Sequence, residues 1–167
     1  MSEGLQALTH LTSLDRSLLS PILTAGAWSN CIEVLGGKNM IIITMAVELM
    51  ANLSLSEEVV RYTKLSSEVD LLSALFLEHC LSDLPPDSQQ YKLAYGITSW
   101  FANLTQSFQV VKDTLAKKPA LITGLLRLLN LNLDSNLAHR LLSILDDVKE
   151  DVKLRKHIPS NLSTSDI

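Results

Sequence analysis

The sequence is poor in aromatic residues, which make up 5% of its 167 residues. The hydrophobic share nevertheless reaches 47%, so a chain of this length can bury one core, and that core must be mainly aliphatic. Intrinsic disorder of the whole chain is excluded, because disordered chains lack the apolar residues needed for burial.

Cysteine and long apolar runs are also scarce. Cys31 and Cys80 are the only two cysteines, and the start MSEGLQALTH has neither basic residues nor an apolar secretory segment. We therefore expect reduced thiols and a cytoplasmic location. The longest apolar run is interrupted by Thr44 and Glu48 and falls short of the roughly 20 residues that a bilayer requires. We expect no membrane span.

An excess of basic residues is absent as well. The chain has 14 Lys and Arg against 18 Asp and Glu, a formal charge of −4, so no broad electrostatic footprint for nucleic acid exists. His79 and Cys80 are adjacent, hence about 100° apart on a helix, and no second ligand lies at zinc spacing. We expect no nucleic-acid partner, no metal, no cofactor and no enzymatic activity.

Two further groups of residues fit ordinary structural roles. The segment Gly36-Gly37-Lys38 lacks the Ser or Thr and the earlier Gly of a phosphate-binding loop, and we interpret it as a turn. Near the end of the chain, acidic residues alternate with basic ones, as on a solvated helix face. The acidic members are Asp146, Asp147, Glu150 and Asp151.

Polar residues recur every four positions within two apolar segments, 39–55 and 93–105. At 3.6 residues per turn, each set forms a narrow polar stripe on an otherwise buried helix. The second set follows the first by 51 positions; the members are Thr44, Glu48 and Asn52, then Tyr95, Ser99 and Asn103.

Related segments lie near both ends of the chain. Gln6 and His10 precede Glu48 and Asn52 by 42 positions. Arg140 follows Ser99 by 41 positions, which puts Asn136 one turn earlier and Ile144 opposite Asn103. Four copies of one helix at a spacing near 40 residues predict an all-α helical solenoid, in which the stacking of units creates the core.

The local signals predict the helices between and within these units. Ser56 followed by two acids is a helix start, Pro119 suits a first helical turn, and the Pro-Pro pair within 82–90 indicates an exposed loop. We expect a polar disordered tail over 157–167. The expected helices span 3–13, 16–24, 28–35, 39–55, 57–65, 68–81, 93–105, 108–117, 119–129 and 135–153.

If the four polar helices line one concave side, their stripes form a ladder of binding residues. An extended peptide suits such a ladder, since Asn side chains both donate to and accept from main chain. Equally, Asn52 and Asn103 could bond to a neighbouring helix and hold the repeats in register. The candidate site comprises Gln6, His10, Thr44, Glu48, Asn52, Tyr95, Ser99, Asn103, Asn136 and Arg140.

Units of about 42 residues with short, medium and long helices, the long one ending in A-N-L-[ST], resemble armadillo repeats. The segments EGLQALTHLTS, AVELMANLSLSEEVVRY and YGITSWFANLT are similar to the C-terminal part of the UCS domain of myosin-directed chaperones. His10 stands where that family has Asn. The most specific agreement is at Ala46, Glu48, Leu49, Asn52, Leu53, Glu57, Glu58 and Val59.

This resemblance implies a right-handed armadillo-type solenoid over 2–156, with about three repeats plus a leading helix. It also implies a non-enzymatic chaperone domain whose client is myosin heavy chain, and a link to the ninety-kilodalton heat-shock chaperone through regions not contained in this chain. The alternative is a generic armadillo scaffold for another extended peptide. An importin-like receptor is less suitable, because it needs Trp where Glu48 and Ser99 stand. We expect the leading helix to expose an apolar flank and self-associate.

Overall fold

A computed structural model describes residues 2–81, 84–131 and 134–149 of the chain. These residues form α-helices, two 3-10 helices and connecting turns, without a strand, which confirms the all-α prediction. The elements are α1 (Ser2–Leu14), η1 (Arg16–Leu18), α2 (Leu19–Thr24), α3 (Ala27–Leu35), α4 (Met40–Leu53), η2 (Glu57–Arg61), α5 (Leu65–His79), α6 (Gln89–Ser107), α7 (Gln109–Ala116), α8 (Pro119–Leu129) and α9 (Ser135–Lys149).

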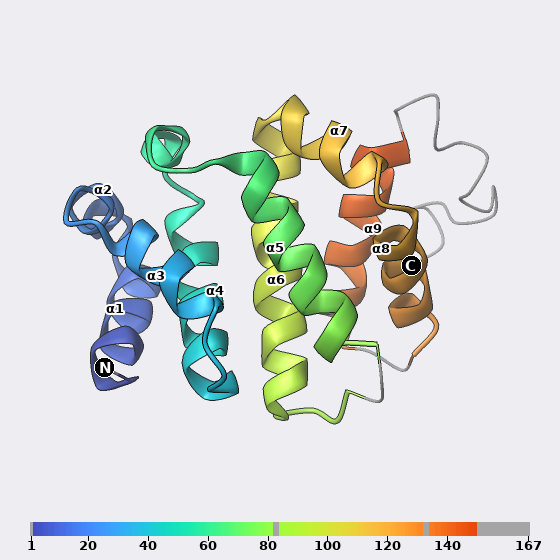
Figure 1. The fold of residues 1–167 in the computed structure, drawn as a ribbon, viewed down its shortest axis with the longest axis horizontal. Coiled ribbons are helices and arrows are strands. Elements are labelled where there is room, and N and C mark those ends of the chain that lie inside the picture. Colours follow the sequence, from blue (N-terminus) through green and yellow to red (C-terminus); the bar gives the residue numbers. More distant parts are fainter. Residues whose placement is uncertain (1, 82–83, 132–133, 150–167) are drawn as a thin grey trace.

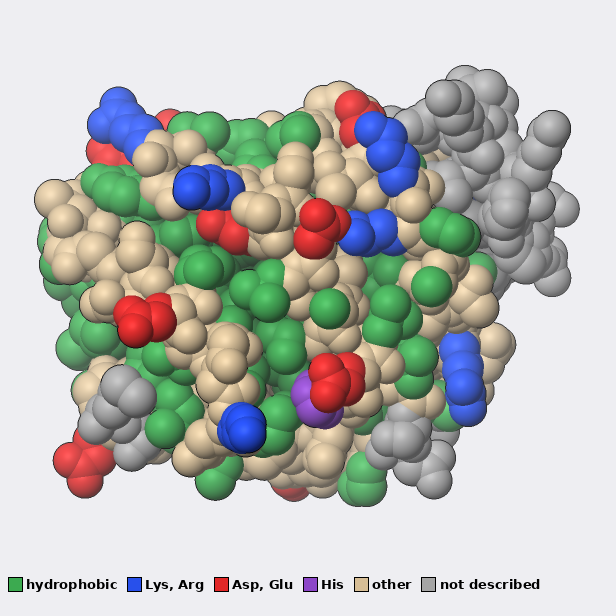
Figure 2. All heavy atoms as spheres, in the orientation of Figure 1, with side chains coloured by type: hydrophobic (Ala, Val, Ile, Leu, Met, Phe, Trp, Pro, Cys, Tyr) green, Lys and Arg blue, Asp and Glu red, His purple; other side chains and the backbone are tan. Residues whose placement is uncertain are grey.

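The helices with polar stripes form one row. α1 packs on α4, α4 on α6 and α6 on α9, and the four run in the same direction (Figure 1). The remaining helices cover one side of this row: α3 packs on α4, α5 on α6, and α8 on α9, while α7 contacts both α6 and α9. In Figure 1, α3 and α5 lie in front of α4 and α6. Figure 2 shows this covered side, with charged side chains scattered between apolar ones.

Most helix ends lie where the sequence places them. The Asn39 side chain accepts hydrogen bonds from the backbone N–H groups of Ile41 and Ile42, at 3.1 and 3.4 Å, and so starts α4. Gly26, with a φ of 86°, adopts the left-handed conformation between α2 and α3. Pro119 occupies the first turn of α8.

Three boundaries differ from the prediction by three or more residues. The expected helix over 57–65 is only the short η2, and α5 begins at Leu65 instead of 68. The buried carboxylate of Glu68 accepts from the Lys64 N–H at 3.0 Å and from the Thr63 hydroxyl, so the chain turns there and starts a new helix. In addition, Ser88 caps α6 four residues earlier than expected, because its hydroxyl accepts from Tyr91 N at 3.0 Å. The expected extension of α9 over 150–153 and the tail over 157–167 lie outside the described residues.

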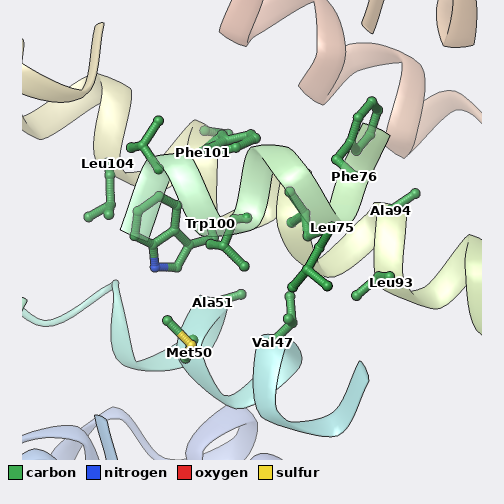
Figure 3. Close-up of a cluster of buried hydrophobic side chains, with 14 of the residues drawn as sticks. Val47, Met50, Ala51, Leu75, Phe76, Leu93, Ala94, Trp100, Phe101 and Leu104 are labelled. Carbon is green, nitrogen blue, oxygen red and sulfur yellow. The ribbon is translucent and has the colours of Figure 1, made fainter. Parts of the chain in front are cut away.

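The core is mainly aliphatic, as the composition predicts, and side chains of α4, α5 and α6 meet in it (Figure 3). The two central helices pack closely at Gly96 of α6, where an added Cβ would lie 2.9 Å from Cγ1 of Val47. Glycine at this position therefore lets α4 and α6 pack directly against each other.

Both cysteines are buried and form no disulfide. Burial raises the pKa of the Cys31 thiol and that of the Cys80 thiol to about 12, so both remain protonated at neutral pH. Within the described ranges, no single helix is both long and apolar enough to cross a bilayer. The bent pair Arg16–Thr24 and Ala27–Leu35, taken together, has sufficient length and apolar content.

Candidate functional site

A groove of about 970 Å³ runs along the row of α1, α4 and α6, and one residue of α9 contributes to its lining. The polar stripes meet there, because parallel neighbouring helices with polar residues at four-residue spacing bring those faces together. Of the ten predicted site residues, nine line the groove: Gln6, His10, Thr44, Glu48, Asn52, Tyr95, Ser99, Asn103 and Arg140. Asn136 is exposed and does not line it. Whether the nine bind a ligand stays a prediction.

Asn52 connects α4 to α1. Its side-chain Nδ2 donates to the backbone oxygen of Thr9 at 3.0 Å and to Oγ1 of Thr12 at 3.1 Å. Both acceptors lie in the last two turns of α1. Because the Thr12 hydroxyl itself donates to Leu8 O at 2.8 Å, it presents a lone pair to the amide of Asn52. Asn52 therefore holds two helices in register.

Asn103 repeats this arrangement between α6 and α4. Its Nδ2 donates to Ala51 O at 3.0 Å and to Oγ of Ser54 at 2.9 Å. We call these two sets of bonds the asparagine clamps. The register-holding alternative thus accounts for the amide nitrogens, whereas neither amide oxygen accepts a hydrogen bond within the described residues. Since both side chains line the groove, these oxygens can serve a ligand.

The third interface, between α6 and α9, uses a different residue. The Thr105 hydroxyl donates to Oδ2 of Asp147 at 2.8 Å, and Oδ1 of Asp147 lies 3.6 Å from Nζ of Lys112. The repeat spacing puts Ile144, which is buried, opposite Asn103. The sequence pattern also assigned Asp147 to a solvated helix face. That assignment is wrong, because Asp147 contacts Thr105 and Lys112. A signal was present, because the hydroxyls Thr12, Ser54 and Thr105 recur at the same offsets, 42 and 51, as the helices themselves.

Arg140 is the one residue of α9 that lines the groove. Its Nη2 donates to the Tyr95 hydroxyl at 2.9 Å, and its guanidinium carbon lies 4.0 Å from the centroid of the Tyr95 ring. Its Nη1 is buried without an acceptor among the described residues. Within the same residues, no carboxylate lies at ion-pair distance from Arg140.

Glu48 lines the groove and is half-buried. Desolvation raises the pKa of its carboxyl group, and the nearby Lys92 ammonium partly opposes this effect. Lys92 also lines the groove, so the α6 and α9 side carries two cations while the α4 side carries an acid. The charge of the groove lining therefore changes from negative to positive along the row.

Two hydroxyls of the lining form hydrogen bonds within their own helices. The hydroxyls of Thr44 and Ser99 donate to the main chain of their own helices, at 2.7 and 2.6 Å. In the described segments, no group of three or more His, Cys, Asp or Glu residues could hold a metal ion. Apolar side chains complete the lining, namely Ile41, Met45 and Leu55. Such a mixture of amides, hydroxyls, charges and apolar contacts suits recognition of a polypeptide.

No family model, no curated protein and no solved structure matches the chain. The likeness to UCS domains therefore depends on the sequence motifs alone.

Proposed function

We propose that the chain is a protein-binding module of the right-handed armadillo type, and that its groove receives an extended segment of a protein client. The observation that carries this proposal is the meeting of nine polar-stripe residues, from four helices, in one groove. The module acts by binding and needs no catalytic group.

The dimensions and chemistry of the groove support an extended occupant. Neighbouring helices pack about 10 Å apart, so a row of four spans about 30 Å, which about nine residues of extended chain can follow. The amide oxygens of Asn52 and Asn103 suit main-chain N–H groups, because they are not used by the asparagine clamps. Exposed Ile41 and Leu55 offer contacts for apolar side chains.

The motifs similar to UCS domains point to the client. We propose that the module assists folding and assembly of the myosin motor in the cytoplasm, with myosin heavy chain as the bound protein. A generic armadillo scaffold for another peptide is the second candidate, since it would use the same groove. The two candidates differ only in the identity of the protein that the groove retains.

The test is a pull-down from cytosol with the purified chain and two variants. Ser99→Trp fills the groove, and Ser29→Trp adds the same side chain on the exposed face of α3 as a matched control. We expect myosin heavy chain to be enriched by the wild type and by Ser29→Trp but not by Ser99→Trp, provided that the melting temperatures agree. Groove-dependent enrichment of another protein favours the scaffold, and equal retention by Ser99→Trp rejects the groove as the binding site.

A further inference from the structure

We infer that the segment bound in the groove carries a carboxylate, which pairs with the guanidinium of Arg140. This inference depends on the proposed function, because it assumes that the groove binds polypeptide. It adds the chemical class of the anchoring group and the side of the groove on which that group lies.

The first argument is the isolation of Arg140 from acidic groups. Two lysines of comparable burial are paired: Lys112 with Asp147 and Lys118 with Asp70. Arg140 has no such partner among the described residues, and its Nη1 is buried without an acceptor. A partly desolvated cation with an unused donor is unfavourable alone, so an incoming carboxylate gains both an ion pair and a hydrogen bond.

The second argument is that Arg140 is already oriented. The Tyr95 hydroxyl accepts from Nη2 at 2.9 Å, and the guanidinium lies over the Tyr95 ring at 4.0 Å. Both contacts restrict the side chain before any ligand binds, which lowers the entropy cost of binding. Neither contact involves a carboxylate, so both position the cation without neutralising its charge.

The third argument is the charge pattern of the groove. Lys92 lies with Arg140 on the α6 and α9 side, whereas Glu48 of α4 and Glu3 of α1 lie on the other side. An acidic group is attracted at the first side and repelled at the second. The carboxylate of the bound segment therefore sets the register in which the segment lies along the row.

The test uses a display library of short random peptides with free C termini, so that side-chain and terminal carboxylates are both sampled. Peptides retained by the wild type but not by Ser99→Trp are sequenced, since these bind in the groove. We expect the retained peptides to be enriched in Asp or Glu, or to share residues at a fixed distance from their free C terminus. Synthetic copies that carry Asn or Gln in place of the enriched acid, or an amidated C terminus, should bind about tenfold more weakly. Copies that carry Ser or phosphoserine in place of the enriched acid show whether a phosphate binds in place of the carboxylate.

Variants then identify the cation. Arg140→Gln should reduce the affinity for the acidic peptide by the same factor as removal of its acid, while leaving the affinity of the neutral copy unchanged. Arg127→Gln removes a charge from the exposed face of α8 and should change neither affinity. Arg140→Lys keeps the charge and provides the comparison if Arg140→Gln unfolds.

The outcomes separate this inference from the proposed function. Groove-dependent peptides without acidic enrichment, or acidic peptides whose neutral copies bind equally well, overturn the inference and leave the proposed function intact. A preference for phosphoserine over the carboxylate also overturns it in favour of a phosphopeptide. Absence of any peptide that distinguishes wild type from Ser99→Trp overturns both.

Discussion

The side-chain amide of Asn52, on α4, donates two hydrogen bonds to α1. The amide of Asn103, on α6, likewise donates two to the C-terminal end of α4. Asn52→Ala or Asn103→Ala leaves two partly buried acceptors without this donor. We therefore expect each substitution to lower the free energy of unfolding by about 1 to 2 kcal/mol, measured by urea denaturation.

Asn136→Ala is the matched control for these substitutions, because its side chain is exposed and does not line the groove. Its effect should stay within about 0.5 kcal/mol. Unchanged stability of Asn52→Ala and Asn103→Ala, combined with weaker client binding, would show that the amides serve the ligand and that the asparagine clamps contribute nothing to folding.

Glu48 gives a pH-dependent prediction at the same scale. Desolvation raises the pKa of Glu48 in the folded protein above its ordinary value of 4.5, so its ionised form is less stable there than in the unfolded chain. The contribution of this group to stability is full below pH 4.5 and is lost as the pH rises through the folded-state pKa. Glu48→Gln should therefore raise the melting temperature at pH 7, with a gain that shrinks as the pH falls through the folded-state pKa and disappears below 4.5.

The same variant should alter client affinity, because it removes a negative charge from the groove lining. We expect its unfolding to stay cooperative. Glu33→Gln, on the exposed face of α3, controls for the loss of one surface charge. A lower melting temperature of Glu48→Gln at neutral pH would reveal a stabilising partner for the carboxylate and contradict the prediction.

At the scale of elements, packing decides how closely α4 and α6 approach. Gly96→Ala should bring a Cβ within 2.9 Å of Cγ1 of the buried Val47. Overpacking of this kind costs about 1 to 3 kcal/mol, and the higher helix propensity of Ala returns up to about 1 kcal/mol, so net destabilisation is expected in thermal denaturation.

Two further variants make this measurement specific. Gly4→Ala meets no atom within 4 Å and should be neutral or slightly stabilising. Val47→Ala removes the opposing methyl groups, so the double variant with Gly96→Ala should lose less stability than the sum of the two single changes. Additive losses would show that the two helices do not press on each other at this point.

Helix positions were predictable where local signals determine them. The span of α8 agrees with the expected 119–129, because Pro119 sets its start and the apolar period sets its face. The prediction of a helix after Ser56 was wrong in its end, because the turn into α5 depends on Glu68. The carboxylate of Glu68 also accepts from Trp28 Nε1 at 2.9 Å. A bond between residues 40 positions apart leaves no local signal in the sequence.

The candidate site was predictable to the same extent. Periodicity placed Glu48, Asn52 and Asn103 on one face, and that face lines the groove. It could not show which atoms of each amide are used, because this depends on the distance between helices. It also missed Asp147, because this residue lies three positions after Ile144 and so falls outside the four-residue spacing of the stripe.

At the scale of the whole molecule, the first helix of the row exposes two large apolar side chains. On α1, Leu14 is 71% exposed and Leu11 is 47% exposed, so the flank predicted from the sequence is present. We expect self-association through this flank, because other helices of the row bury their apolar faces against neighbours. Sedimentation velocity at rising concentration should show a larger species that Leu11→Glu with Leu14→Glu abolishes.

Val110→Glu on α7, which replaces an exposed apolar residue elsewhere, is the control for this experiment. It should leave the association unchanged. A wild-type chain that remains monomeric at every concentration would refute self-association through α1.

The asparagine clamps also have a mechanical consequence. Both join helices near their C-terminal ends, whereas α6 and α9 are joined near both ends, by Tyr95 with Arg140 and by Thr105 with Asp147. Among the described residues, the N-terminal ends of α1, α4 and α6 share no side-chain hydrogen bond across the row. We therefore expect α6 and α9 to resist separation along their length, and α1, α4 and α6 to separate more easily at their N-terminal ends. Thermal fluctuations should therefore change the width of the groove more beside Gln6 and Thr44 than beside Arg140.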